Sequence, residues 1–96
     1  HTIPGEFELY QNYPNPFNSN TIINYDLLQS THVEIKIFDI LGKEIITLVN
    51  NIEFPGKKSI SWNGVDKDGT HVSSGVYIYN LILDDAIFTK KMLLIK

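Results

Sequence analysis

The chain has 96 residues, 43% of them hydrophobic, and a formal net charge of −3. This length suits a single domain that can fold without disulfide or metal staples. The acidic balance argues against nucleic acid as a partner, because phosphate binding needs a basic patch. The sequence contains no cysteine, which excludes a disulfide framework, a thiolate metal site and a cysteine nucleophile.

The first residues give no targeting signal. His1-Thr2-Ile3-Pro4 lacks the basic, apolar and small-residue zones of a signal peptide, and the apolar runs are far shorter than the roughly 20 residues of a membrane span. A start at His1 suggests a fragment of a longer protein. We expect residues 1–6 to be a linker remnant and residues 7–96 to form one domain.

A segment with two prolines follows a short edge strand predicted at residues 7–10. Pro14 and Pro16 lack the backbone donor that a central strand needs and push their predecessors toward extended geometry. We therefore predict that residues 11–18 are extended along the edge of the fold, with Tyr13 and Phe17 inserted into the core.

The next two segments alternate between apolar and polar residues, as half-buried strands do. Residues 21–28 and 33–40 show the pattern, with residues 29–32 as a polar connection. The polar set, which includes Asp26, is expected to face water. The side chains predicted to face inward are Ile23, Tyr25, Leu27, Val33, Ile35 and Ile37.

Turn formers divide the rest of the chain. Gly42 is placed to take a positive φ in a hairpin loop, residues 44–49 form the returning strand, and residues 50–56 form a loop. A strand at residues 57–62 points Ile60 and Trp62 inward. The dense turn signal at residues 63–69 precedes residues 70–73, which we expect to pair only briefly.

The last 23 residues, Ser74 to Lys96, read as a hairpin of two long strands with a turn at Asp84-Asp85. Both faces of its first strand are largely apolar, as in a central strand. Lys90 shares a face with apolar residues, so we expect either a bulge or a lysine whose ammonium group reaches water at the rim. About seven strands with turns every 8–12 residues predict an all-β, Ig-like or FnIII-like Greek-key β-sandwich of antiparallel strands.

Little in the sequence suggests catalysis. Asp66 and Asp68, with Asn63, are a weak candidate for a calcium site, but the EF-hand spacing is missing and we favour a turn stabilised by side-chain-to-backbone bonds. The three histidines are scattered, and no nucleophile, P-loop or dinucleotide motif is present. We therefore predict no enzyme activity and no cofactor.

Lysines flank the apolar end of the chain. Lys90, Lys91 and Lys96 bracket residues 92–95. Such charges can guard an edge strand against unwanted pairing, which is the simpler interpretation. They can also mark a recognition feature on an ordered strand.

Three stretches resemble one family. Residues 13–18, Tyr-Pro-Asn-Pro-Phe-Asn, look like its opening motif, residues 33–46 resemble its central motif with an Asp and a Gly, and residues 74–96 resemble its closing motif. The family is the type A C-terminal sorting domain of cargo proteins of the type IX secretion system (also called the Por secretion system), found in Bacteroidetes. Residues 62–69 and 74–77 also resemble the Ig-like domain of flagellar hook-capping proteins, which is similar in fold.

The resemblance implies a non-catalytic signal that directs a passenger domain through the periplasm and across the outer membrane, to the cell surface or the medium. The implied partners are the translocon and a sortase-like protease that removes the domain near residues 1–6. The implied recognition residues are Gly75, Tyr77, Lys91, Met92, Leu93, Leu94, Ile95 and Lys96. The motif positions with an implied structural role are Tyr13, Pro14, Asn15, Pro16, Phe17, Asp39 and Gly42, and the residues themselves add Trp62 as a core position.

Two other functions fit the residues. An Ig-like spacer would be purely structural, and a carbohydrate-binding accessory module would use some of the eleven aromatic residues, although most fall on predicted core positions. The edge strands also leave room for a weak homodimer.

Overall fold

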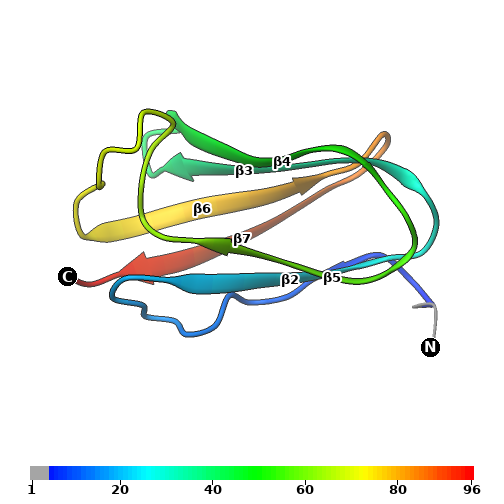
Figure 1. The fold of residues 1–96 in the computed structure, drawn as a ribbon, viewed down its shortest axis with the longest axis horizontal. Helices are drawn as coiled ribbons and strands as arrows, with labels where there is room; N and C mark the ends of the chain where they lie inside the picture. The colour runs from blue at the N-terminus through cyan, green and yellow to red at the C-terminus, as the bar shows by residue number, and fades with distance from the viewer. Residues whose placement is uncertain (1–4) are drawn as a thin grey trace.

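Two antiparallel sheets face each other in the computed structural model, which describes residues 5–96 (Figure 1). The three-stranded sheet has the order β1 (Glu8–Leu9), β2 (Thr21–Leu27), β5 (Gly56–Trp62). The four-stranded sheet has the order β4 (Glu44–Glu53), β3 (Thr31–Asp39), β6 (Gly75–Ile82), β7 (Ile87–Leu94). The arrangement confirms the predicted all-β sandwich of seven antiparallel strands. Among residues 5–96, no helix has the length and apolar character needed to cross a membrane.

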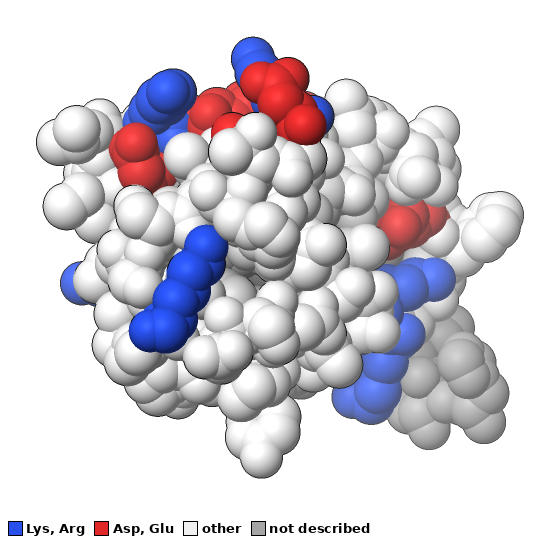
Figure 2. All heavy atoms as spheres, turned by 60° about the vertical axis from the view of Figure 1, so that its left-hand side comes forward, with Lys and Arg blue, Asp and Glu red and all other residues white. Residues whose placement is uncertain are grey.

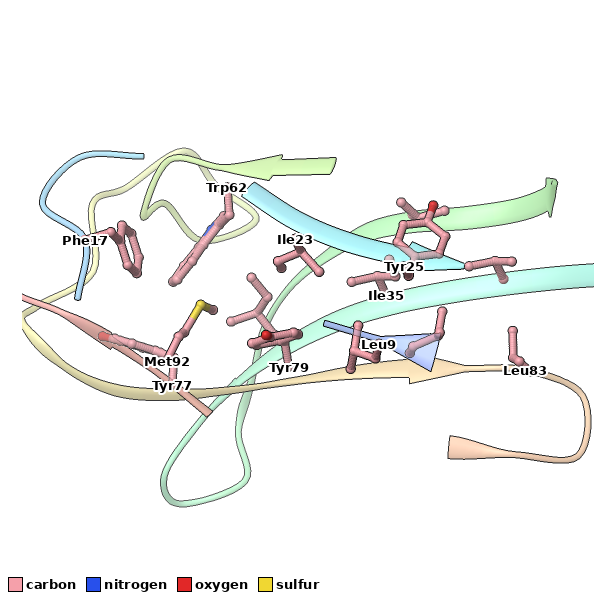
Figure 3. Close-up of a cluster of buried hydrophobic side chains, with 14 of the residues drawn as sticks. Leu9, Phe17, Ile23, Tyr25, Ile35, Trp62, Tyr77, Tyr79, Leu83 and Met92 are labelled. Atoms are coloured by element: carbon pink, nitrogen blue, oxygen red, sulfur yellow. The ribbon is translucent and has the colours of Figure 1, made fainter. Parts of the chain in front are cut away.

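The core lies between the sheets and follows the alternation of the sequence. Every inward-facing residue predicted on β2 and β3 is buried and belongs to one core cluster with Tyr79 and Leu81 of β6. Figure 3 labels part of this cluster, including Ile23, Ile35 and Tyr79. Burying one large apolar side chain contributes roughly 1.5–3 kcal/mol relative to leaving it in water. The period-2 pattern therefore fixes which face of each sheet turns inward.

The final hairpin forms as predicted, and β6 is a central strand between β3 and β7. Its pairing with β7 runs without a register shift from Gly75–Leu94 to Ile82–Ile87. Lys90 lies opposite Tyr79 in this ladder and is half-buried. The unbroken register removes the bulge alternative and favours a lysine at the rim of the sandwich.

Tyr13 does not enter the core, contrary to the prediction. Its side chain is 77% exposed, because the backbone of Tyr13 pairs with Ile22 through two hydrogen bonds of 2.9 Å. Residues directly opposite in an antiparallel pair share a face, and Ile22 faces outward. Phe17, the other predicted core residue of this segment, is buried. Both Tyr13-Pro14 and Asn15-Pro16 peptide bonds are cis.

Asp26 was expected to face water, and it is only 6% exposed. The edge strand β1 lies beside it, with Glu8 opposite Asp26, and covers this end of β2. The Tyr10 hydroxyl donates a hydrogen bond to the carboxylate, and Lys57 Nζ lies 3.7 Å from Oδ2. A buried carboxylate is tolerated when it has such partners.

β4 is longer than predicted. The loop expected at residues 50–56 begins only after Glu53, because Asn50 and Asn51 pair with Glu34 and Val33. β3 likewise begins at Thr31 rather than Val33, since Thr31 lies opposite Glu53. The asparagines have low strand propensity, and the continued antiparallel pairing of the β3–β4 hairpin overrides it.

Candidate recognition site at the C-terminal strand

β7 divides the candidate recognition residues between two faces. Met92 and Leu94 are buried in the core, whereas Lys91 and Leu93 point to the outer face of the sheet. Ile95 and Lys96 continue beyond the strand, and Ile95 is 51% exposed. The alternation of β7 thus assigns half of the implied site to the interior and half to the surface.

The segment of residues 11–18, here called the strap, lies along the free edge of β7. Phe17 N–H donates to the Leu93 carbonyl at 3.0 Å, and Ile95 N–H donates to the Phe17 carbonyl at 2.9 Å. These two bonds form a parallel bridge between the strap and the end of β7. The strap is therefore tied to the outer edge of the four-stranded sheet by a single bridge.

Side chains of the strap extend this contact. Asn15 Oδ1 accepts from Leu93 N–H at 3.0 Å, Gln11 Nε2 donates to the Lys91 carbonyl at 2.6 Å, and Asn18 Nδ2 donates to the Ile95 carbonyl at 3.2 Å. Pro14 and Pro16 flank Asn15 and carry no N–H of their own. Gln11 and Asn18 were not predicted as site residues, and no local pattern links them to β7.

The backbone of the terminal strand is consequently occupied on both edges. β6 pairs with one edge along residues 87–94, and the strap bonds the other edge at residues 91, 93 and 95. A partner that added a strand here would have to displace the strap. The surface left for recognition consists of the outward side chains Lys91, Leu93, Ile95 and Lys96.

Tyr77 supports the candidate recognition site from the interior of the sandwich. It is 6% exposed, its hydroxyl donates to the Ser73 carbonyl at 2.6 Å, and its ring lies 5.5 Å from that of Trp62. Phe17 contacts Trp62 from the strap, with 5.7 Å between ring centroids (Figure 3). Such aromatic pairs contribute about 0.5–1.5 kcal/mol beyond area burial. The cluster joins the strap, β5 and β6 under the terminal strand.

The turn before β6 also contacts the end of the chain. Ser74 Oγ accepts a hydrogen bond from Lys96 N–H at 3.0 Å. Gly75 begins β6 opposite Leu94, and a side chain placed there would meet no atom within 4 Å. Ser74 fixes the backbone at Lys96, which the sequence did not indicate.

Asp39 and Gly42 shape the hairpin between β3 and β4. Asp39 Oδ1 accepts from the N–H groups of Leu41 and Lys43, both at 2.9 Å. Gly42 has φ of 86°, a left-handed conformation that costs glycine little and other residues more. The tip exposes the apolar side chains of Ile40 and Leu41.

Asp66 forms the same kind of turn in the loop after β5. Its Oδ1 accepts from Asp68 N–H at 2.9 Å and from Thr70 N–H at 3.0 Å, which matches the side-chain-to-backbone bonding expected of aspartate in turns. Within residues 5–96, no group of three or more acidic, histidine or cysteine side chains is placed to hold a metal ion. The absence of a calcium site stays a prediction.

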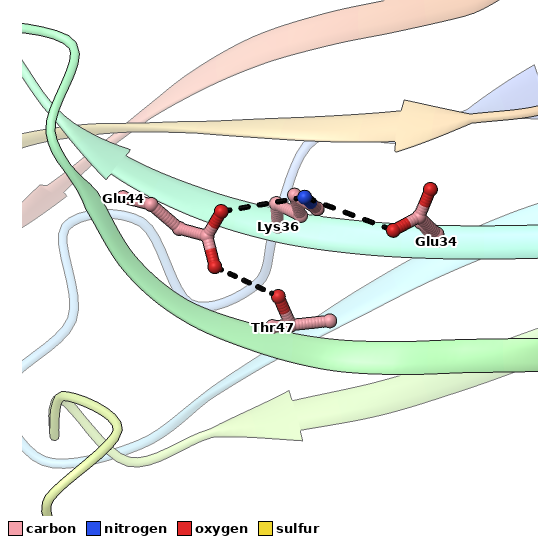
Figure 4. A network of polar contacts seen from close by, with 4 residues as sticks. All are labelled: Glu34, Lys36, Glu44 and Thr47. Atoms are coloured by element: carbon pink, nitrogen blue, oxygen red, sulfur yellow. Dashed lines mark hydrogen bonds and ion pairs between the residues drawn. The ribbon is translucent and has the colours of Figure 1, made fainter.

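Charges on the outer face are distributed unevenly. Lys36 lies between Glu34, at 3.7 Å, and Glu44, at 3.3 Å (Figure 4). Hydrogen bonds from Thr47 and Lys36 hold the pKa of Glu44 below its usual range. In the view of Figure 2, most of the visible acidic side chains lie along the top of the molecule, a further group lies at the right, and the lower half of this face shows none. Neither Lys91 nor Lys96 forms an ion pair with another residue of the part described, 5–96.

The sequence profile of the family described as "Secretion system C-terminal sorting domain" matches residues 11–96. The chain belongs to this family. The match begins at the first residue of the strap and includes β7, so the two segments that meet at the terminal edge both lie inside it. A sorting domain is a non-catalytic signal carried by a secreted or cell-surface protein, and the candidate site is described in these terms below.

Solved structures support the fold of the sorting domain. Dimeric latent PorU from Porphyromonas gingivalis is similar with a TM-score of 0.74 and 17% identity, over 97% of this chain and 10% of that one. PorZ from the same organism, described as an essential surface component of the type-IX secretion system, is similar with a TM-score of 0.62 and 20% identity, over 94% of this chain and 11% of that one. The chain thus spans about a tenth of each. No curated protein matches.

Proposed function

We propose that this sorting domain directs a passenger protein across the outer membrane through the type IX secretion system. The family match over residues 11–96 carries the proposal. The likeness to PorZ, a component of that system, supports the choice of system. The passenger would be a separate domain of the full-length protein.

The outer side of the terminal strand is the proposed docking element. Lys91 and Lys96 are exposed and have no acidic partner within residues 5–96, so their charges are available to a translocon component. Gly75, Tyr77, Met92 and Leu94 would act by holding the strand in place rather than by contact, because the three larger side chains are buried.

Removal of the domain by a sortase-like protease is the proposed later step. The candidate region is residues 1–6, of which residues 1–4 lie outside the described part of the chain. Glu6 is exposed, as a cleavable segment must be. The passenger would then remain at the outer surface or be released.

The test is a fusion of this domain behind a periplasmic reporter in a host with a working type IX system. We expect the reporter to reach the cell surface or the medium, measured by protease accessibility and by fractionation. The double variant Lys91→Glu with Lys96→Glu should leave the reporter in the periplasm while retaining the parent melting temperature, because both side chains are exposed.

The matched control is Lys43→Glu with Lys67→Glu. It makes the same change of net charge at two exposed lysines outside β7, and it should export normally. A parent fusion retained in the periplasm would refute the sorting function. Normal export of the Lys91 and Lys96 variant would refute the proposal that docking depends on these two charges, and it would leave the sorting function itself standing.

The two alternative functions have distinct signatures. A structural spacer would leave the reporter in the periplasm. A carbohydrate-binding module would show glycan affinity on exposed aromatic side chains, but Phe17, Tyr25, Trp62, Tyr77 and Tyr79 are buried. Tyr13 and Phe54 are the large aromatic side chains exposed within residues 5–96, and nothing in the chain's fold joins them into one platform.

A weak homodimer would have to form through the remaining edges. The strap already bonds Leu93 and Ile95, and β4 has two register shifts opposite β3. Bulges of this kind disfavour pairing along an edge strand. We propose that any association of two copies uses an edge that the strap leaves open, either β5 of the three-stranded sheet or Ile87–Thr89 of β7.

A further inference from the structure

A hollow of about 320 Å³ opens at the end of the sandwich where β7 ends. Its floor is apolar and consists of Leu94 and Gly64, and its rim carries Asn63, His71 and Lys96. Gly64 has φ of 74°, and a side chain there would meet Leu94 Cδ2 at 3.7 Å. A residue larger than glycine would therefore be strained and would cover part of the floor.

Hydrogen bonds within the loop after β5, and from neighbouring segments to the end of the chain, hold the walls of the hollow in place. Val72 N–H donates to the Gly64 carbonyl at 2.9 Å, and Val65 bridges to His71. Lys96 is fixed through Ser74, and Asn18, which also lines the hollow, donates to the Ile95 carbonyl. The hollow is thus built from the strap, the loop after β5 and the terminal strand.

The lining favours an anion. It holds one lysine, one histidine and the amide groups of two asparagines, and no acidic side chain. A carboxylate complements this arrangement, because its oxygens can accept hydrogen bonds from the donors of the rim. An aspartate or glutamate side chain has this chemistry.

We infer that the hollow receives an acidic side chain of the protein on which the sorting domain docks. This inference rests on the proposed function and names the chemistry of its partner. A macromolecular partner is favoured because both edges and the inner face of residues 91–95 are occupied, so recognition must use outward side chains and the end of the strand. The hollow adjoins Lys96 and continues that same surface.

Ser19 provides the test because it lines the hollow, is exposed, and its side chain makes no hydrogen bond within residues 5–96. In the reporter fusion, Ser19→Asp should lower surface delivery about tenfold, as expected when one charge-assisted contact of about 1.4 kcal/mol is lost. Ser19→Asn has nearly the same size without the charge and should export as the parent does.

Ser30→Asp is the positional control, since Ser30 is an exposed turn residue beyond the opposite end of β2. It should export normally, and all three variants should keep the parent melting temperature. Normal export of Ser19→Asp with a working parent fusion would overturn the inference and leave the sorting function standing. Equal losses of surface delivery in Ser19→Asp and Ser19→Asn would show that the hollow is recognised by its shape, and they would overturn the inference that it receives a carboxylate. A parent fusion that is not exported would instead refute the proposed function.

Discussion

Tyr79 links the strap to the centre of the four-stranded sheet. Its hydroxyl accepts from Asn12 N–H and donates to the Tyr10 carbonyl, each at 2.8 Å. Burial raises the pKa of Tyr79 to about 12, although the Asn12 hydrogen bond lowers it slightly. Because this pKa is higher in the folded than in the unfolded protein, its contribution to stability is complete below about pH 10 and is lost as the pH rises toward 12.

We expect Tyr79→Phe to reduce the free energy of unfolding at pH 7 by about 1–3 kcal/mol, because two backbone groups lose a partner. The difference from the parent should shrink by about 1 kcal/mol between pH 9 and pH 11, since the variant lacks the titrating group. Urea unfolding at the three pH values measures both effects. A difference that does not change with pH would contradict the assignment of the raised pKa to Tyr79.

At the scale of the element, the strap covers the end of the β7 edge that no strand of the sheet pairs with. Its contacts with β7 combine two backbone bonds with three side-chain bonds, and Asn15 supplies the acceptor for Leu93 N–H. An unpaired edge invites pairing with other chains. The strap therefore protects the terminal strand as well as positioning it.

Asn15→Ala should lower the free energy of unfolding by about 0.5–1.5 kcal/mol, the net contribution of one hydrogen bond, and should speed amide exchange at Leu93. Asn15→Asp retains an oxygen acceptor and should keep slow exchange there. Hydrogen exchange followed by NMR distinguishes the two. Unchanged exchange at Leu93 in Asn15→Ala would show that the side-chain contact does not protect the edge.

At the scale of the whole molecule, the terminal residues belong to the core and to the proposed docking surface at once. Deletion of residues 91–96 removes Met92 and Leu94 from the interior, at a cost of roughly 2–5 kcal/mol for each large side chain. Domains have only about 5–15 kcal/mol of stability. The truncated domain should therefore be largely unfolded.

Circular dichroism and thermal unfolding of the truncated domain test this expectation. A truncated domain that melts as the parent does would show that the end of β7 is dispensable for folding. If the truncated domain is unfolded, its failure to be exported does not report on recognition by the translocon. The Lys91 and Lys96 variants, which should keep the fold, address recognition directly.

The sequence predicted the features that depend on local pattern. Val33, Ile35 and Ile37 alternate with polar residues, and that period alone identified their buried face. The predictions for Tyr13 and Asp26 were wrong because the environments of these residues depend on Ile22 and Glu8, which lie beside them only through strand pairing. The bonds from Gln11 and Asn15 to β7 join residues about 80 positions apart, and the resemblance named the strap and the strand without indicating that they touch.

The bridge between Phe17 and the strand end has a consequence for the making of the protein. Phe17 can form these hydrogen bonds only when Leu93 and Ile95 are present, so a chain that stops before them cannot form the bridge between the strap and the strand end. A polypeptide interrupted earlier carries the opening half of the signal without its closing half. Such a chain would leave the backbone N–H and carbonyl of Phe17 without these two partners and the strap without its bridge to the terminal strand.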